Sequence, residues 1–287
     1  MALASGVLLL ASCVAGLAAR PKDLSLIFKE TIASHQANSY AATPIKKQRV
    51  AVCGAGGKAG SMVFGALQRA AQTWDAGLAP PRALVGAARG SRALNSCLGS
   101  SFVLAFAGED LVKLTDFRDE AKIGAALAGC GTVVVPSKMR PQGAVTGTEW
   151  SWDVDMDGDA DVFARVVAAA SAAGVHVVAV APPGAAADVE KTLDEAGTAF
   201  TLLVVGDLAL TRNWNLNKGI QQVVRVGAGN DAAGELQCED LASVVAQVVV
   251  CLDPTASRVA SLAGSSEGYD DQEALTRAIN AGLMALS

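Results

Sequence analysis

The sequence predicts a single α/β domain in which a doubly wound parallel sheet carries helices on both faces. Two observations predict this class. Short apolar runs rich in β-branched residues alternate with helix-length amphipathic segments along the chain. Apolar residues make up 51% of the 287 residues but aromatic residues only 5%. The core must therefore be built from Ala, Val and Leu, which suits strands that are buried on both faces.

The alternation begins at Gln48 and continues to the C-terminal end. The expected strands cover residues 48–53, 82–88, 111–115, 132–135, 175–181, 199–205, 221–226 and 259–263. The expected helices cover residues 61–73, 120–128, 161–173, 186–196, 240–251 and 272–285. Helices of this length between strands imply parallel crossovers. Residues 48–287 are therefore expected to form one domain of ordinary size.

Charge and cysteine usage exclude several classes of protein. The net charge is −5, and Lys46-Lys47 is the longest basic run, so a nucleic-acid partner is not expected. Five of the six cysteines fall in the domain, and none are spaced as C-x-x-C. We expect free thiols in a reducing compartment in preference to a disulfide or zinc framework.

Residues 1–47 are interpreted as a leader. Residues 2–19 carry no charge, and the small residues before Arg20 are typical of a signal-peptidase site at Ala18 or Ala19. Residues 31–73 contain no acidic residue, as in organelle transit peptides. This two-part pattern favours delivery to a plastid (chloroplast). A secreted protein, a membrane anchor and a disordered N-terminus are the alternatives, and membrane contact is expected only through the leader.

A glycine-rich turn follows the first expected strand and opens the first expected helix. Gly54, Gly57 and Gly60 give G-x-x-G-x-x-G, and Gly54 with Gly56 also gives G-x-G. Such a turn lets a dinucleotide's pyrophosphate reach the unpaired N–H groups of the helix. In this context it predicts a Rossmann-type domain. The residues expected to bind the cofactor here are Gly54, Gly56, Gly57, Lys58, Ala59 and Gly60.

The end of the second strand favours NADP over NAD. NAD-binding domains usually place an acidic residue there for the ribose 2′-hydroxyl. This chain has Arg89 and Arg92 and no acid between residues 87 and 92. An arginine can bind a 2′-phosphate in bidentate fashion. NADP is therefore the expected cofactor, with Arg89 as a binding residue and NAD as the less favoured choice.

From Arg49 to Ala263 the motifs resemble the atypical short-chain dehydrogenase/reductase family, in particular its NmrA-like NAD(P)-binding branch. The glycine motif fits. Residues 115–119 (TDFRD) followed by 123–129 (IGAALAG) resemble the family's third strand and next helix, and residues 239–242 (EDLA) resemble a late helix start. Residues 201–206 (TLLVVG) resemble a stretch that normally ends in Arg-Pro-Gly, although Val204-Val205 replaces Arg-Pro. The resemblance implies that Asp116 lies beside the adenine.

The catalytic pair of that family is missing. Active members use a Tyr to protonate the substrate carbonyl and a Lys four residues later to lower the pKa of that Tyr. The two tyrosines of this chain, Tyr40 and Tyr269, lie outside the relevant segment, and no Lys lies between Lys138 and Lys191. No catalytic residue is therefore assigned. Lys138 and Asp207 are the candidate replacement acids, because both follow expected strands.

Three functions are compatible with the sequence. The first is an NAD(P)(H)-binding protein that senses redox state, acts as a scaffold or joins a protein complex. The second is an NADPH-dependent reductase with a non-standard proton donor, and the third is a structural subunit of a membrane complex. No metal site is expected. Asp153, Asp155 and Asp157 resemble the start of a calcium loop, but Ala164 occupies the position of its bidentate Glu.

Overall fold

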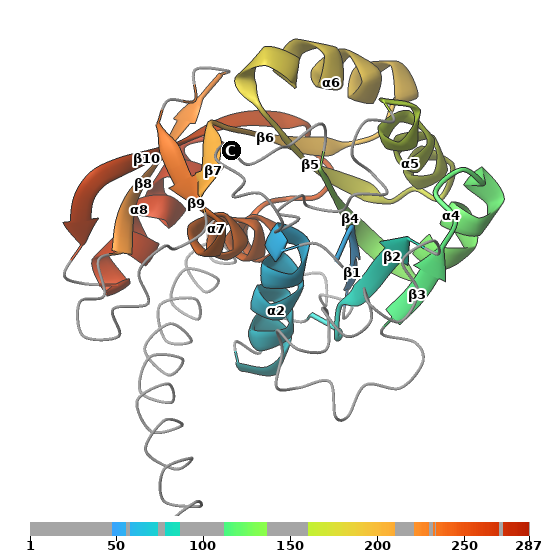
Figure 1. Ribbon diagram of the computed structural model, residues 1–287, viewed down its shortest axis with the longest axis horizontal. Coiled ribbons are helices and arrows are strands. Elements are labelled where there is room, and N and C mark those ends of the chain that lie inside the picture. The colour runs from blue at the N-terminus through green and yellow to red at the C-terminus, as the bar shows by residue number, and fades with distance from the viewer. Residues whose placement is uncertain are drawn as a thin grey trace, which may run out of the picture.

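A computed structural model describes residues 48–55, 58–73, 78–86, 112–136, 160–209, 221–229, 232, 234–269 and 272–286. Within these residues, eight strands form one sheet in the order β3-β2-β1-β4-β5-β6-β10-β8 (Figure 1). The strands are β1 (Arg49–Cys53), β2 (Arg82–Gly86), β3 (Val112–Thr115), β4 (Cys130–Pro136), β5 (His176–Ala181), β6 (Phe200–Val205), β8 (Gln221–Ala228) and β10 (Arg258–Tyr269).

Neighbouring strands from β3 to β10 are parallel, whereas the edge strand β8 is antiparallel to β10. The expected doubly wound α/β fold is confirmed, with this one antiparallel strand added. Antiparallel edge strands on otherwise parallel sheets are common in such folds.

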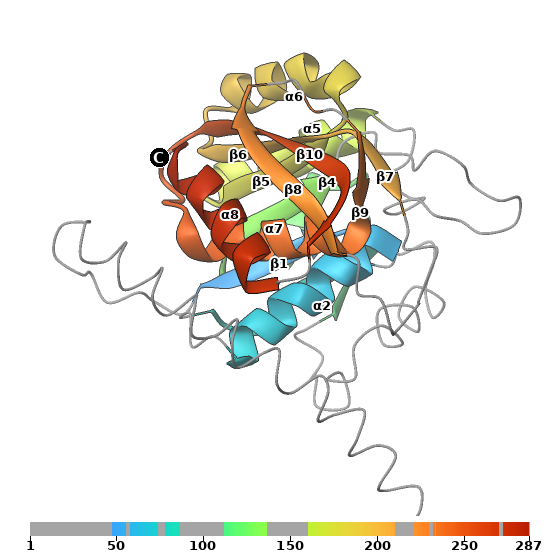
Figure 2. The same cartoon turned by 90° about the vertical axis from the view of Figure 1, so that its left-hand side faces the viewer.

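The described helices divide between the two faces of the sheet (Figures 1 and 2). One face carries α2 (Lys58–Thr73), α7 (Cys238–Cys251) and α8 (Gln272–Met284). The other face carries α4 (Glu120–Leu127), α5 (Ala160–Ala172) and α6 (Pro183–Ala196).

Alternation along the strands builds a core on each face. In β1, Val50 and Val52 belong to the cluster under α2, while Ala51 and Cys53 belong to the cluster under α4 and α5. Successive side chains of a strand point to opposite faces, so a strand covered on both faces must be apolar at every position. This is why β4, β5 and β6 appear in the sequence as unbroken apolar runs.

The expected elements are present with boundaries that shift by a few residues, except that β10 runs six residues further, to Tyr269. One pair of strands was not expected: β7 (Asp207–Ala209) pairs in parallel with β9 (Glu235–Gln237). Each has three residues, which is too short for a periodic pattern to be recognised.

The described cysteines are all free, as expected from their spacing: Cys53, Cys130, Cys238 and Cys251. Burial raises the pKa of Cys238 and of Cys251 to about 12, so both remain thiols at neutral pH. Within the described ranges, no helix has the length and apolar character needed to cross a membrane.

Candidate functional site

The order of the strands defines where a ligand would bind. From β1 the chain moves outward through β2 to β3, and from β4 it moves outward on the other side through β5 to β6. The direction therefore reverses between β1 and β4, which are neighbours in the sheet. In open α/β sheets, ligands bind at such a switch point, outside the carboxyl ends of the strands.

The predicted glycine turn lies at this point. Gly54 follows β1 and has a φ of 66°, in the left-handed region that glycine adopts without strain. The Ala55 N–H donates to the Leu84 carbonyl of β2 at 3.3 Å, and this bond ties the turn to the sheet. Gly56 and Gly57 lie outside the described residues.

Helix α2 starts at Lys58, immediately after the turn, and has no acidic residue in its first turn. Ala59 and Gly60 are buried within that first turn. The N–H groups of a helix's first turn lack intrahelical partners and carry partial positive charge. The amino end of α2 therefore presents positive potential, with no carboxylate of its own first turn to oppose it, at the switch point.

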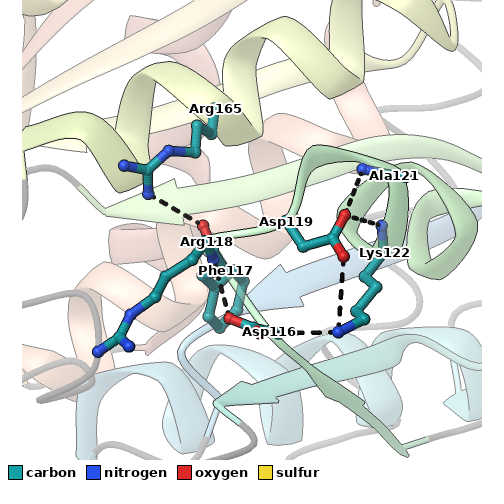
Figure 3. Close-up of polar contacts among 7 residues, drawn as sticks. All are labelled: Asp116, Phe117, Arg118, Asp119, Ala121, Lys122 and Arg165. Atoms are coloured by element: carbon teal, nitrogen blue, oxygen red, sulfur yellow. Dashed lines mark hydrogen bonds and ion pairs between the residues drawn. The ribbon is translucent and has the colours of Figure 1, made fainter.

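Asp116 immediately follows β3 and lies in a tight, hydrogen-bonded turn (Figure 3). Its Oδ1 accepts from the Arg118 N–H at 3.1 Å, and its carbonyl accepts from the Asp119 N–H at 3.1 Å. The Lys122 Nζ lies 3.7 Å from its Oδ2. A carboxylate has about four acceptor positions, and the side chain of Asp116 is 44% exposed. The group thus keeps capacity for another donor, such as the amino group of adenine.

Helix α4, which follows this turn, is fixed by hydrogen bonds at both of its ends. The Asp119 side chain caps its start by accepting from the Ala121 and Lys122 N–H groups. At its end, the buried Arg82 guanidinium of β2 donates to the carbonyls of Ala126 and Ala128, both at 2.7 Å. Cations at a helix C-terminus are favourable because they meet unpaired carbonyls. Sequence analysis did not find this role, since an Arg at the start of a strand is normally exposed.

The segment directly after β5 consists of Pro, Gly and Ala over residues 182–187. Strand β5 ends at Ala181, and α6 begins with Pro182 as its N-cap, without a side-chain hydrogen bond. The next inward-facing residues, Ala185 and Ala186, are buried alanines. Lys191, the first lysine along α6, is exposed and pairs with Glu195 at 3.8 Å.

Of the remaining predicted residues, Arg89, Arg92 and Lys138 lie outside the described parts of the chain, as do residues 153–158. Asp207 is exposed and begins β7 directly beyond the carboxyl end of β6. The described residues contain no group of three or more His, Cys, Asp or Glu side chains placed to hold a metal ion.

Asp240 is a titratable residue of this edge that sequence analysis did not single out as an acid. It lies in the first turn of α7, which leads into β10, a strand parallel to β6. A helix that packs on the sheet before a parallel strand runs opposite to that strand, so its amino end lies at the carboxyl edge. Helices α7 and α2 run side by side on the same face (Figures 1 and 2). The first turn of α7 is therefore on the same edge as the glycine turn.

Asp240 is partly buried and lies beside another acidic residue, Glu239. Burial, followed by the neighbouring charge of Glu239, raises the pKa of Asp240 to about 7. The Oε2 atom of Glu239 is itself buried without a hydrogen-bond partner. Carboxyls with a pKa near neutrality can hold or release a proton at physiological pH, and they concentrate at functional sites.

Comparison with known proteins gives structural matches only. The sequence matches no protein-family model and no curated protein. A structure assigned as an NAD-dependent epimerase/dehydratase from Bacillus halodurans is similar, with a TM-score of 0.54 and 15% identity over 82% of this chain and 99% of that one. A Rossmann-fold NAD(P)-binding family protein from Shigella flexneri has a TM-score of 0.51 and 15% identity, covering 78% and 98%.

The chain has the fold of NAD(P)-binding Rossmann proteins. A third similar structure is a short-chain dehydrogenase/reductase from Veillonella parvula DSM 2008 in complex with NADP, with a TM-score of 0.50 and 12% identity over 78% and 98% of the two chains. At such identities the likeness establishes the Rossmann fold.

Proposed function

We propose that this protein binds NADP(H) and belongs to the atypical, NmrA-like type of short-chain dehydrogenase/reductase without that family's catalytic pair. Its role would be to sense redox state, or to act as a scaffold within a protein complex. One observation carries the proposal: Gly54 has the left-handed backbone of a tight turn at the switch point, whereas the segment directly after β5 offers Pro, Gly and Ala where a proton donor is needed.

The residues at the carboxyl edge fit a dinucleotide. Gly54 has the left-handed backbone that a tight turn needs, and the amino end of α2 supplies N–H groups for a pyrophosphate. Asp116 retains acceptor capacity for the adenine amino group. Arg89 would bind the 2′-phosphate. Bound NADP(H) supplies hydride chemistry, while the protein supplies position and protons.

Calorimetric titration with NADP and with NAD, combined with native mass spectrometry of the purified protein, tests the binding function. We expect retained or readily bound NADP and weaker NAD binding. Removal of the bidentate arginine contact in Arg89→Ala should erase much of the preference, because such contacts contribute about 1.5–3 kcal/mol. Equal affinity for both cofactors in the wild type would contradict the NADP assignment.

A turnover screen with NADPH and a panel of aldehydes, ketones and quinones tests the lack of catalysis. Loss of a positioned general acid typically slows catalysis by about 10²–10⁴-fold, so we expect only slow residual turnover. A substrate that turns over near 10 s⁻¹, a common enzyme value, would show that another acid has taken over.

Asp240 supports an NADPH-dependent reductase as the second candidate function. A carbonyl reduced by hydride transfer needs one proton at its oxygen, and a carboxyl with the raised pKa of Asp240, about 7, can donate one near neutral pH. If the screen finds turnover, Asp240→Asn should abolish it, while Asp207→Asn and Lys138→Ala should retain it. The opposite pattern would assign the proton donor to Asp207 or Lys138.

Residues 1–47, the leader, bear on where in the cell the protein is delivered. We infer delivery to a plastid in two steps, with residues 1–47 absent from the mature domain. Fusing these residues to a fluorescent protein tests this, and retention of the fusion in the secretory pathway would contradict it.

A further inference from the structure

The turn between β3 and α4 carries a cation that the predicted adenine contact does not use. Arg118 stands two residues beyond Asp116, and its side chain is exposed. Within the described residues its guanidinium has no hydrogen bond or ion pair, and Figure 3 shows it extending away from the Asp116–Lys122 pair. The same figure shows Arg165 of α5 on the other side of the turn.

The register of the sheet places this turn beside the end of β2. Strands β2 and β3 are parallel neighbours, and the last residue of β2, Gly86, pairs with Thr115, the last residue of β3. The two strands therefore end at the same level. In Rossmann domains the residues that follow the second strand contact the ribose 2′ position. The turn of residues 116–119 thus starts level with the end of β2, after which the contact with the ribose 2′ position is expected.

Hydrogen bonds anchor the backbone at Arg118 and at the residue before it. Its N–H donates to the Asp116 Oδ1 at 3.1 Å, and the Phe117 side chain before it is buried, with 4% exposed. The Phe117 carbonyl accepts from the Arg165 Nη1 at 3.4 Å. A fixed backbone lowers the entropy lost when a long side chain engages a ligand, because only the side chain must be ordered.

The charges around the turn leave Arg118 available. Lys122 lies 3.7 Å from Asp116 and 3.5 Å from Asp119, so two carboxylates already neutralise that ammonium. Arg165 is engaged with the Phe117 carbonyl. The Arg118 guanidinium is left without a countercharge in this turn, and a planar guanidinium binds phosphate in bidentate geometry.

We propose that Arg118 is a cationic contact for the 2′-phosphate of NADP. The proposal rests on the proposed NADP-binding function and adds a specificity residue from the turn after β3. The 2′-phosphate is the chemical difference between NADP and NAD, so the contact raises the affinity for NADP and leaves that for NAD almost unchanged.

Calorimetric titrations of Arg118→Ala with NADP and NAD test this assignment. We expect NADP affinity to fall about tenfold, the size of one partly exposed charge-assisted contact, and NAD affinity to change by less than about twofold. Arg118→Lys should lie between the wild type and Arg118→Ala. Arg225→Ala is the matched control: it removes an exposed arginine from β8, at the far edge of the sheet from β3.

Three results would overturn the assignment. Unchanged NADP affinity in Arg118→Ala would show that the side chain stays in solvent. Equal losses for NADP and NAD would place it on the adenine ring, and equal losses in Arg225→Ala would reduce the effect to net charge. If the wild type binds neither dinucleotide, the proposed function fails as well, so failure of the Arg118 contact alone remains distinguishable. Unfolding temperatures of all variants verify that each is folded.

Discussion

Because His176 is buried, we expect the folded protein to lose stability in mild acid. It begins β5 with 7% of its surface exposed, and its Nε2 lies 3.1 Å from the Oγ1 of the fully buried Thr201 on β6. Burial lowers the pKa of His176 to about 4, and the charge of Arg258 adds to this, while the Pro254 backbone and Asp253 oppose it. The native state therefore keeps the imidazole neutral at a pH where the unfolded chain protonates it.

The difference between the folded and unfolded pKa values of His176 sets the direction and the size of the change in stability. Because the folded pKa is depressed, the stabilisation is present above the unfolded value of 6.5 and is lost as the pH falls towards 4. The full separation corresponds to roughly 3 kcal/mol. Between pH 7 and pH 5, His176 becomes largely protonated in the unfolded chain but stays mostly neutral in the native state. The free energy of unfolding should therefore fall by about 2 kcal/mol.

Urea unfolding of the wild type and His176→Gln at pH 7, 6 and 5 measures this. Glutamine does not titrate and can still hydrogen-bond to Thr201. Carboxylates that protonate near pH 5 are common to both proteins, so the difference between the two pH profiles isolates His176. The wild type should lose about 2 kcal/mol more than the variant. Profiles that stay parallel would refute the reasoning, whatever the baseline stability of the variant.

Three further predictions concern the site and its supports. Gly57→Val should abolish dinucleotide binding in calorimetry while circular dichroism stays native, because a branched side chain would occupy the space of the pyrophosphate; unchanged affinity would move the site elsewhere. Arg82→Met should lower the free energy of unfolding by about 3 kcal/mol, since two carbonyls of α4 lose a charged donor; a loss below about 1 kcal/mol would show that water replaces it. The stability of Asp240→Asn relative to the wild type should rise by roughly 2.5 kcal/mol between pH 5 and pH 8, because the raised pKa makes the native carboxyl costly to ionise; a difference that does not change with pH would show that the pKa of Asp240 is not raised.

The sheet could be predicted because its strands are covered on both faces. Strand β4 shows this: it was expected over residues 132–135 from an unbroken β-branched run, and it extends over Cys130–Pro136. The antiparallel direction of β8 and its position at the edge could not be predicted. They depend on how the chain returns after β7, and residues 210–220, which make that connection, show no periodic pattern.

The glycine turn could be located because its chemistry is local. A strand, several glycines and a helix within about 25 residues are enough to specify it, and Gly54 has the backbone that this requires. Arg82 and Asp240 could not be located in this way. The guanidinium of Arg82 contacts residues 44 and 46 positions away, and the pKa of Asp240 depends on burial by the folded chain. Such long-range contacts and burial cannot be recognised from the pattern of a single sequence.

The two sides of the switch point are built differently, and this separates binding from catalysis. On the side of β1, β2 and β3, the turns are fixed by their own hydrogen bonds: Ala55 to β2, and Asp116 to Arg118 and Asp119. None of these bonds involves the segment after β5. On that other side, the residues directly after β5 are Pro, Gly and Ala, and the Asp240 carboxyl has a pKa near neutrality. The described turns on the side of β1, β2 and β3 therefore do not depend on the segment after β5. Asp240 comes from a different helix, α7, and burial with the neighbouring charge of Glu239 raises the pKa of its carboxyl to about 7.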